Sequence, residues 1–141
     1  MNLMEIEGYN MPEELHYEEH HYWVRVEGGI LIMGMDDFAQ KMAGDIVFVQ
    51  LPFEGKKLTQ GKKFSSVESG KWVGSIFAPV HGELLQSNSK LETTPTLINH
   101  DCYGEGWIFK IRPDDINDIK SLINGAEAIK EWVLADIDKY K

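Results

Sequence analysis

The sequence predicts a mainly β fold with one short internal helix and further helices at the C-terminus. Runs of β-branched and aromatic residues alternate with glycine and proline through the first 113 residues. That alternation is typical of antiparallel strands joined by tight turns. Helical periodicity is confined to a short stretch after residue 35 and to residues 114–141. We therefore expect a β core with helices packed on it.

The clearest predicted element is a hairpin near the middle of the chain. Two β-rich segments, residues 63–69 and 72–77, flank the sequence Ser69-Gly70-Lys71. Gly70 can adopt the positive φ that hairpin turns often need. Lys71 is then expected to project from the tip into solvent. A lysine in such a place is usually only a solvated charge, so the hairpin alone predicts no function.

The elements before this hairpin follow from turn and cap residues. Residues 1–16 form a polar arm rich in carboxylates, which we expect to be irregular. Gly28-Gly29 joins two β-rich runs in a predicted hairpin. Asp36 is a predicted N-cap for a short helix that ends at Gly44. Residues 45–51 then form a strand that stops at Pro52.

The elements after the hairpin are predicted in the same way. A strand begins at residue 83, a polar loop with one helical turn covers 87–99, and a second strand covers 104–111. Asp114 or Asp115 caps a first C-terminal helix that ends at Gly125. A second helix follows over 126–140, with an apolar stripe that we expect to pack on the β core.

Composition limits the possible functions. The chain has 141 residues and a mass of 16.1 kDa, which is typical of a single domain spanning 1–141. Its formal net charge of −9 argues against binding to nucleic acid or to an anionic membrane. The single cysteine, Cys102, excludes an internal disulfide and fits a reducing compartment. Without an apolar run long enough for a bilayer or an opening signal peptide, we expect a cytoplasmic protein.

Motifs for catalysis and metal binding are weak. The sequence contains no nucleophile elbow, Walker loop or dinucleotide fingerprint. His16, His20 and His21 are close in sequence, but no cysteine or second motif completes a metal site, so we interpret them as surface histidines. We therefore expect a carrier protein rather than an enzyme, with no metal.

Several separated motifs together resemble the glycine cleavage system H-protein family. The matching segments are 17–29, 34–40, 44–52, 55–56, 67–71, 79–83 and 103–107. The resemblance covers almost the whole chain, in the family's order and with its gaps. It implies a barrel-sandwich hybrid of two small antiparallel sheets, the lipoyl-domain-like fold.

The same resemblance implies a prosthetic group at the central hairpin. The family's Glu-Ser-x-Lys motif stands here as Glu68, Ser69, Gly70 and Lys71, followed by Trp72. It implies lipoic acid in amide linkage on Lys71, attached by a lipoate ligase or lipoyl transferase. A biotin carrier would be expected to have methionines beside the lysine, and Gly70 and Trp72 stand there instead.

The family shelters the loaded end of this arm in a surface cleft, and the resemblance makes Tyr22, Met42 and Ser75 candidates for lining it. The family has carboxylates where this chain has Tyr22 and Ser75. A cleft without carboxylates suits an uncharged cargo better than a cationic one. The segment from Glu68 to Gly74 also resembles the lipoate-binding proteins of the heterodisulfide-reductase-like sulfur oxidation system.

Three hypotheses follow. The favoured one is a lipoyl carrier of sulfur that serves a heterodisulfide-reductase-like complex. The alternative is an H-protein that carries the aminomethyl group from glycine decarboxylase to aminomethyltransferase, with dihydrolipoamide dehydrogenase as a further partner. The third is an unmodified scaffold that retains only the fold, which the intact Glu68–Lys71 motif disfavours.

Overall fold

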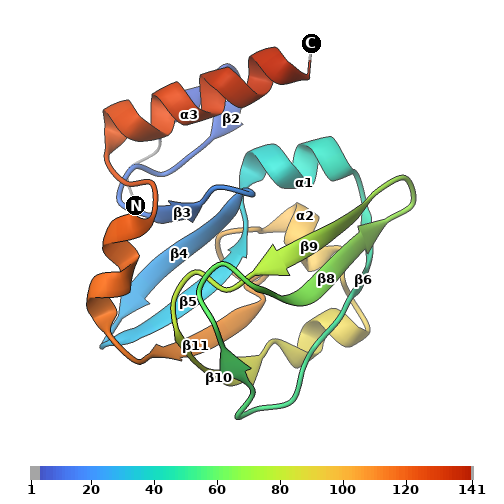
Figure 1. The fold of residues 1–141 in the computed structure, drawn as a ribbon. Coiled ribbons are helices and arrows are strands. Elements are labelled where there is room, and N and C mark those ends of the chain that lie inside the picture. Colours follow the sequence, from blue (N-terminus) through green and yellow to red (C-terminus); the bar gives the residue numbers. More distant parts are fainter. Residues whose placement is uncertain (1–3, 141) are drawn as a thin grey trace.

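Two antiparallel sheets curl around a common core (Figure 1). The computed structural model describes residues 4–140. The larger sheet has the order β3 (His16–Glu18), β4 (Tyr22–Glu27), β5 (Ile30–Met35), β11 (Phe109–Pro113), β10 (Gly82–Ser87) and β7 (Lys57–Leu58). The smaller has the order β6 (Ile46–Val49), β8 (Lys63–Ser69) and β9 (Val73–Phe77). This arrangement confirms the predicted barrel-sandwich fold.

The core between these sheets follows from strand alternation. Val24, Leu31 and Met33 of the larger sheet are completely buried, as are Val67 and Ile76 of the smaller one. Side chains on one face of a strand recur every second residue, so each sheet turns an apolar face inward. The core thereby fixes which residues of β8 and β9 remain on the outside.

Within residues 4–140, four short helical segments and one long helix complete the fold. They are α1 (Asp37–Ala43), η1 (Ser89–Glu92), α2 (Leu97–His100), η2 (Ile116–Ser121) and α3 (Ala126–Lys139). The predicted caps of α1 are confirmed, since the Asp36 side chain accepts a hydrogen bond from the Ala39 amide and Gly44 ends the helix with φ 80°. The predicted Gly28-Gly29 turn between β4 and β5 is confirmed as well.

The N-terminal arm is more ordered than we expected. Of the described part, Glu5–Ile6 (β1) and Tyr9–Asn10 (β2) form a small hairpin, and residues 1–3 lie outside the described residues. Met11 and Leu15 are fully buried. They join a second apolar cluster with Ile129 and Val133 of α3, so the prediction of an irregular arm was wrong from residue 4 onward.

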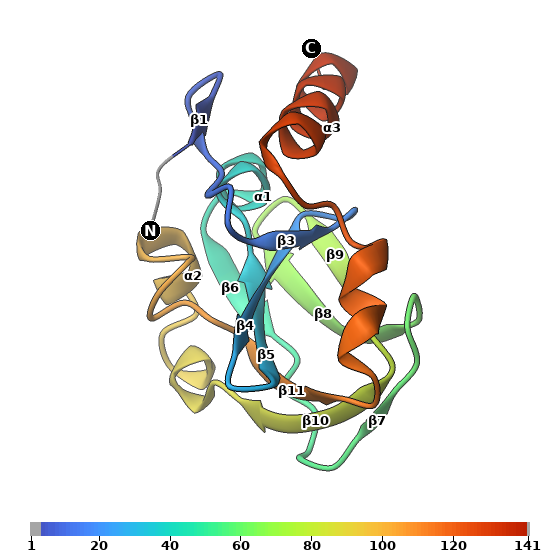
Figure 2. The ribbon, with the colours of Figure 1, turned by 90° about the vertical axis from the view of Figure 1, so that its left-hand side faces the viewer.

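The first predicted C-terminal helix is also different. Asp115 caps only the short 3₁₀ segment η2, and Ile123 leaves it to pair with Tyr17 in an isolated β-bridge. Figure 2 shows the chain leaving β11 through η2 and running up to α3. The predicted second helix is confirmed as α3, and its apolar stripe packs in the second cluster, which includes Trp23 and Ile32 of the larger sheet.

The loop between residues 87 and 99 contains η1 and the start of α2. Two predicted strands are shorter than expected. The strand predicted over 45–51 is regular only over β6, and that over 104–111 begins at Phe109. Among the helices of residues 4–140, none is long and apolar enough to cross a membrane.

Candidate functional site

The β8–β9 hairpin presents Lys71 at its tip. Glu68 pairs with Val73, and the amide of Ser69 donates to the carbonyl of Trp72 over 2.8 Å. The Lys71 amide donates to the Ser69 hydroxyl over 3.3 Å. Ser69 therefore closes the turn, and Gly70 does not have the positive φ that we predicted for it.

Lys71 is exposed, as predicted, and its position relative to α1 is now defined. Its Cε lies 3.5 Å from the place where a Cβ on Gly44 would stand. Gly44 ends α1, so the lysine stem runs toward the C-terminal end of that helix. A group attached to Nζ would therefore begin beside Gly44.

Trp72 folds back over the first residues of β9. A Cβ on Gly74 would overlap the Trp72 ring. The ring can pack here because residue 74 is a glycine and has no side chain. The indole is 39% exposed and lines the two cavities described next. A tryptophan two positions before a glycine could have predicted this packing from the sequence, and we did not predict it.

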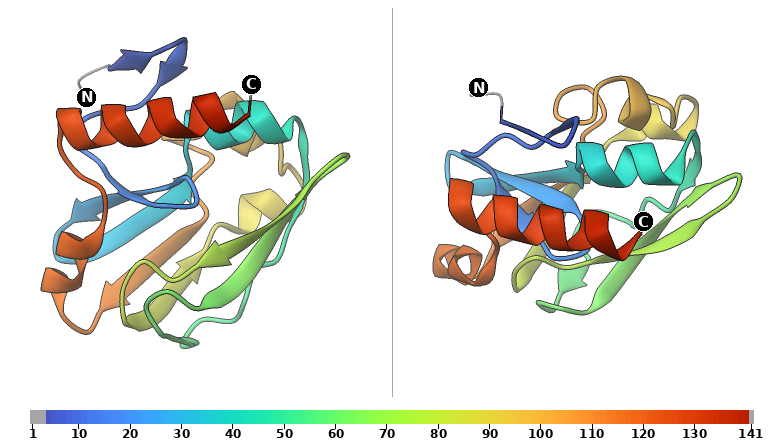
Figure 3. Two further views of the ribbon diagram at one scale, coloured as in Figure 1. Left: turned by 45° about the horizontal axis from the view of Figure 1, so that its top comes forward. Right: turned by 90° about the horizontal axis from the view of Figure 1, so that it is seen from above.

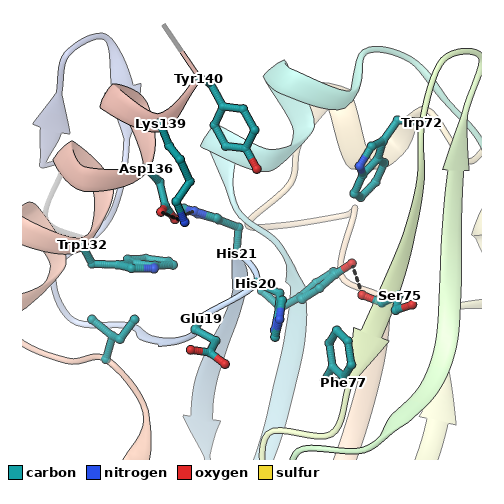
Figure 4. Close-up of a pocket in the computed structure, with 12 residues that line it drawn as sticks. Glu19, His20, His21, Trp72, Ser75, Phe77, Trp132, Asp136, Lys139 and Tyr140 are labelled. Carbon is teal, nitrogen blue, oxygen red and sulfur yellow. Dashed lines mark hydrogen bonds and ion pairs between the residues drawn. The ribbon is translucent and has the colours of Figure 1, made fainter.

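A cavity of about 650 Å³ lies between α3 and the β8–β9 hairpin (Figure 4). We call it the polar cavity. Its lining residues are Glu19, His20, His21, Tyr22, Trp72, Ser75, Phe77, Ile123, Trp132, Asp136, Lys139 and Tyr140. The hairpin supplies one wall, α3 supplies the opposite wall, and the turn between β3 and β4 supplies the floor.

A smaller cavity of about 160 Å³ adjoins it, and we call it the apolar cavity. Its lining residues are His20, His21, Phe38, Ala39, Met42, Ala43, Trp72 and Tyr140. Four of these also line the polar cavity, so the two spaces are neighbours. The three predicted cleft residues are thus brought to one region, with Tyr22 and Ser75 in the polar cavity and Met42 in the apolar one.

Tyr22 and Ser75 bring no charge to the polar cavity, as expected. The Tyr22 hydroxyl donates to the backbone carbonyl of Ser75 over 3.0 Å. Burial raises the pKa of the Tyr22 phenol well above its ordinary value, which keeps it neutral. The expectation that the cleft lacks carboxylates was nevertheless wrong, because Glu19 and Asp136 also line it.

His21 is the most constrained histidine of the site. Its Nδ1 lies 2.8 Å from Asp36 Oδ2, and its Nε2 lies 2.7 Å from Asp136 Oδ2. Its ring stacks on Trp132 with centroids 4.2 Å apart and planes 16° apart. Burial alone would lower the pKa of His21, but the charge of Asp36 and the hydrogen bonds to both carboxylates raise it overall. The interpretation of His21 as a surface histidine was wrong.

Among residues 4–140, one group of side chains could hold a metal ion, and it contains one histidine, His20. Glu18, Glu19 and His20 have ligand atoms within 4.8 Å of one another. The pair between Glu18 Oε2 and His20 Nδ1, at 2.6 Å, already accounts for two of these groups. His16 is not part of the group. Cys102 is buried, which raises the pKa of its thiol and keeps it protonated.

The family model described as glycine cleavage H-protein matches residues 15–134 of this chain. The chain belongs to the glycine cleavage H-protein family. It is 44% identical to the glycine cleavage system H protein of Bacteroides thetaiotaomicron, over 88% of this chain and 98% of that protein. It is equally 44% identical to the protein of that name from Symbiobacterium thermophilum, over 83% of this chain and 91% of that one.

A solved structure supports the same assignment. The crystal structure of a glycine cleavage system H protein from Mycobacterium marinum superposes with a TM-score of 0.77 at 29% identity. The alignment covers 89% of this chain and 98% of the other. Members of the H-protein family are carriers that bear lipoate covalently on a lysine, and they are not catalysts. The sulfur-oxidation branch favoured from the sequence is not shown by these relatives.

Proposed function

We propose that Lys71 bears the lipoyl group and that the protein carries the aminomethyl group between glycine decarboxylase and aminomethyltransferase. Dihydrolipoamide dehydrogenase would return the reduced arm to its disulfide form. This is the alternative of the sequence analysis, and the relatives named glycine cleavage system H protein support it over the sulfur hypothesis. A lipoate ligase or lipoyl transferase would attach the group within the Glu68–Lys71 motif.

The residues around Lys71 suit a lipoyl amide. When bound, that group supplies a flexible arm whose dithiolane interconverts between disulfide and dithiol, so that a sulfur can bear cargo. Lys71 is exposed to an attaching enzyme, and its stem runs beside Gly44, the residue after Ala43. Ala43 and Met42 line the apolar cavity, which therefore offers hydrocarbon contact within reach of the lysine.

The observation that carries the proposal is the presence of two carboxylates on the lining of the polar cavity. A one-carbon unit that ends in an amine is cationic near neutral pH, and such a charge is costly to shelter without an anionic partner. Glu19 and Asp136 supply that partner, although Tyr22 and Ser75 replace the carboxylates of the family pattern. Tyr22 instead braces the β9 wall through its hydrogen bond to Ser75.

The uncharged side chains at Tyr22 and Ser75 keep sulfur carriage as a second candidate. Sulfur on the arm would need no anionic partner, and Trp72 could pack against it. Its partner would be a heterodisulfide-reductase-like complex. The carboxylates of Glu19 and Asp136 have no evident role in that function, and for this reason we rank it second.

The attachment site is tested by coexpressing the protein with a lipoate ligase and mapping the modified peptide by mass spectrometry. We expect a single lipoyl group on Lys71. A lipoyl group on another lysine, with Lys71 unmodified, would contradict the assignment.

The cargo is tested by glycine-dependent carbon dioxide exchange with purified glycine decarboxylase. The lipoylated protein is compared with the Bacteroides thetaiotaomicron H protein at equal lipoylation. We expect rates of the same order for the two carriers. A rate near background here, together with transfer of sulfur from a thiol donor to the arm, would replace the aminomethyl assignment with the sulfur one.

A further inference from the structure

Helix α3 supplies one wall of the polar cavity, although it begins 55 residues after Lys71. Seen from above, α3 lies alongside α1, and its C-terminal end lies toward the β8–β9 hairpin (Figure 3, right). In Figure 4, Asp136 and Lys139 face Trp72 and Ser75 across the cavity. Two segments that are distant in the sequence therefore line this cavity from opposite sides.

Asp136 is the inward-facing acid of that wall. Its side chain is only 17% exposed, and its Oδ2 lies 2.7 Å from His21 Nε2. Its Oδ1 lies 3.6 Å from the amine of Lys139, whose side chain is 72% exposed. Contact with such a solvated amine is weak and easily exchanged. One carboxylate oxygen is thus fixed by His21, and the other can accept a new partner from the cavity.

His21 determines where this carboxylate stands. Both of its ring nitrogens face carboxylate oxygens, and imidazole donates at both positions only as the cation. Behind it, Asp36 is fully buried and is fixed in turn by the Ala39 amide at the start of α1. The chain of contacts from Asp36 through His21 to Asp136 therefore ties α3 to α1.

Two carboxylates, Glu19 and Asp136, and two cations, Lys139 and protonated His21, line the polar cavity. A protonated His21 neutralises one of the two aspartates, and Glu19 adds another carboxylate on the cavity floor. Glu18 is paired with His20, and Lys139 is the cation of the α3 wall. A cationic group that enters the polar cavity therefore finds Asp136 Oδ1, a carboxylate oxygen whose ion-pair partner among residues 4–140 is only the exposed amine of Lys139.

We propose that Asp136, positioned from α3 by His21, binds the cationic amine of the cargo on the loaded arm. The proposal rests on the aminomethyl function proposed above and adds the residue that receives the charge. Asp136 contacts the cargo, and His21 is a positioning residue. The carboxylates missing at Tyr22 and Ser75 are thereby replaced from the opposite wall of the cavity.

The test measures how long loaded protein keeps its cargo in the absence of any partner enzyme. Lipoylated wild-type protein and Asp136→Asn are reduced and treated with formaldehyde and ammonium. The thiol sulfur and the ammonia nitrogen both bond to the formaldehyde carbon, and one water leaves. After removal of reagents, intact mass follows the loss of the group. The asparagine oxygen can still accept from His21, while the oxygen proposed to bind the amine becomes an uncharged NH2 donor, and we expect the half-life to shorten about tenfold.

Two controls separate cargo binding from a structural effect. Asp138→Asn makes the same change on an exposed residue of α3 outside both cavities and should leave the half-life unchanged. Formaldehyde alone adds to the thiol as a neutral hydroxymethyl group, and its loss should be equal in wild type and Asp136→Asn. If the substitution disturbed the cavity as a whole, the half-lives of the cationic group and of the neutral hydroxymethyl group would both change.

Three results would overturn the proposal. They are equal half-lives of the cationic group in wild type and Asp136→Asn, an equal effect on the neutral group, and a wild-type half-life no longer than that of the same adduct on free dihydrolipoamide. None of them would contradict the aminomethyl function itself, which is tested separately by carbon dioxide exchange. Failure of that exchange would remove the function without depending on Asp136.

Discussion

The two walls of the polar cavity are specified by the sequence in different ways. The hairpin wall comes from one continuous segment, in which Glu68 and Val73 are cross-strand partners and Lys71 stands between them. The α3 wall is joined to the site by a contact between His21 and Asp136, 115 positions apart. A short motif can therefore describe the attachment site, whereas the charge of the cavity depends on how α3 packs.

The largest expected effect is the loss of lipoylation when the lysine of the hairpin wall is replaced. Lys71→Ala should abolish lipoylation completely, as read by intact mass after coexpression with a lipoate ligase. Its free energy of unfolding should change by less than about 0.5 kcal/mol, because an exposed turn side chain contributes little. Lys63→Ala, at the exposed start of β8, is the control and should be lipoylated normally. Lipoylation that persists in Lys71→Ala would contradict the role of the hairpin.

The next largest effect is a loss of stability when the packing of α3 on the second apolar cluster is weakened. Ile129 is fully buried in the second apolar cluster, so Ile129→Ala should lower the free energy of unfolding by about 2–5 kcal/mol. Leu134 on the same helix is 37% exposed, and Leu134→Ala should cost much less. Urea unfolding measures both changes. Equal costs for the two variants would mean that α3 is not docked through this cluster.

A smaller effect concerns Trp72 on the hairpin wall. Gly74→Ala places a methyl group where the Trp72 ring lies, so the ring must move, at a cost of about 1–3 kcal/mol. A Cβ on Gly70 would meet nothing within 4 Å, and Gly70→Ala should therefore be tolerated. Tryptophan fluorescence and thermal unfolding distinguish the two. An unchanged Trp72 signal in Gly74→Ala would show that the ring does not rest on Gly74.

The smallest effect is a pH dependence of the contact between the walls. The folded-state pKa of His21 is raised, so the stabilisation from its protonated form is fully present below its unfolded pKa, near 6.5. That stabilisation is lost as the pH rises through the folded-state pKa. NMR titration of the His21 ring should show a lower pKa in Asp136→Asn than in wild type, and no change in Asp138→Asn. A pKa unaffected by Asp136→Asn would contradict the contact.

Features encoded by neighbouring residues were predicted well. The Gly28-Gly29 turn, the Asp36 cap and the Gly44 end of α1 were all confirmed. Each depends on a few adjacent residues with strong backbone or capping preferences. The bounds of β8 were predicted for the same reason.

Features that depend on distant contacts were not predicted. Met11 lies in a polar arm, and nothing near it in the sequence shows that α3 will bury it. His21 resembles its neighbour His20 in sequence, yet it is buried between Asp36 and Asp136. The sulfur interpretation depended on the resemblance of residues 68–74 to lipoate-binding proteins and on the uncharged Tyr22 and Ser75. The comparison at Tyr22 and Ser75 omitted the carboxylates that other elements bring to the cavity.

The most direct test of this account moves the negative charge from one wall to the other. Ser75 lines the polar cavity opposite Asp136, so Ser75→Asp combined with Asp136→Asn restores a carboxylate on the hairpin wall. The measurement is the half-life of the cationic group on the chemically loaded arm. We predict that Asp136→Asn shortens it about tenfold and that the double variant recovers most of the loss. A half-life that is unchanged by Asp136→Asn, or equally short in the double variant, would contradict the account.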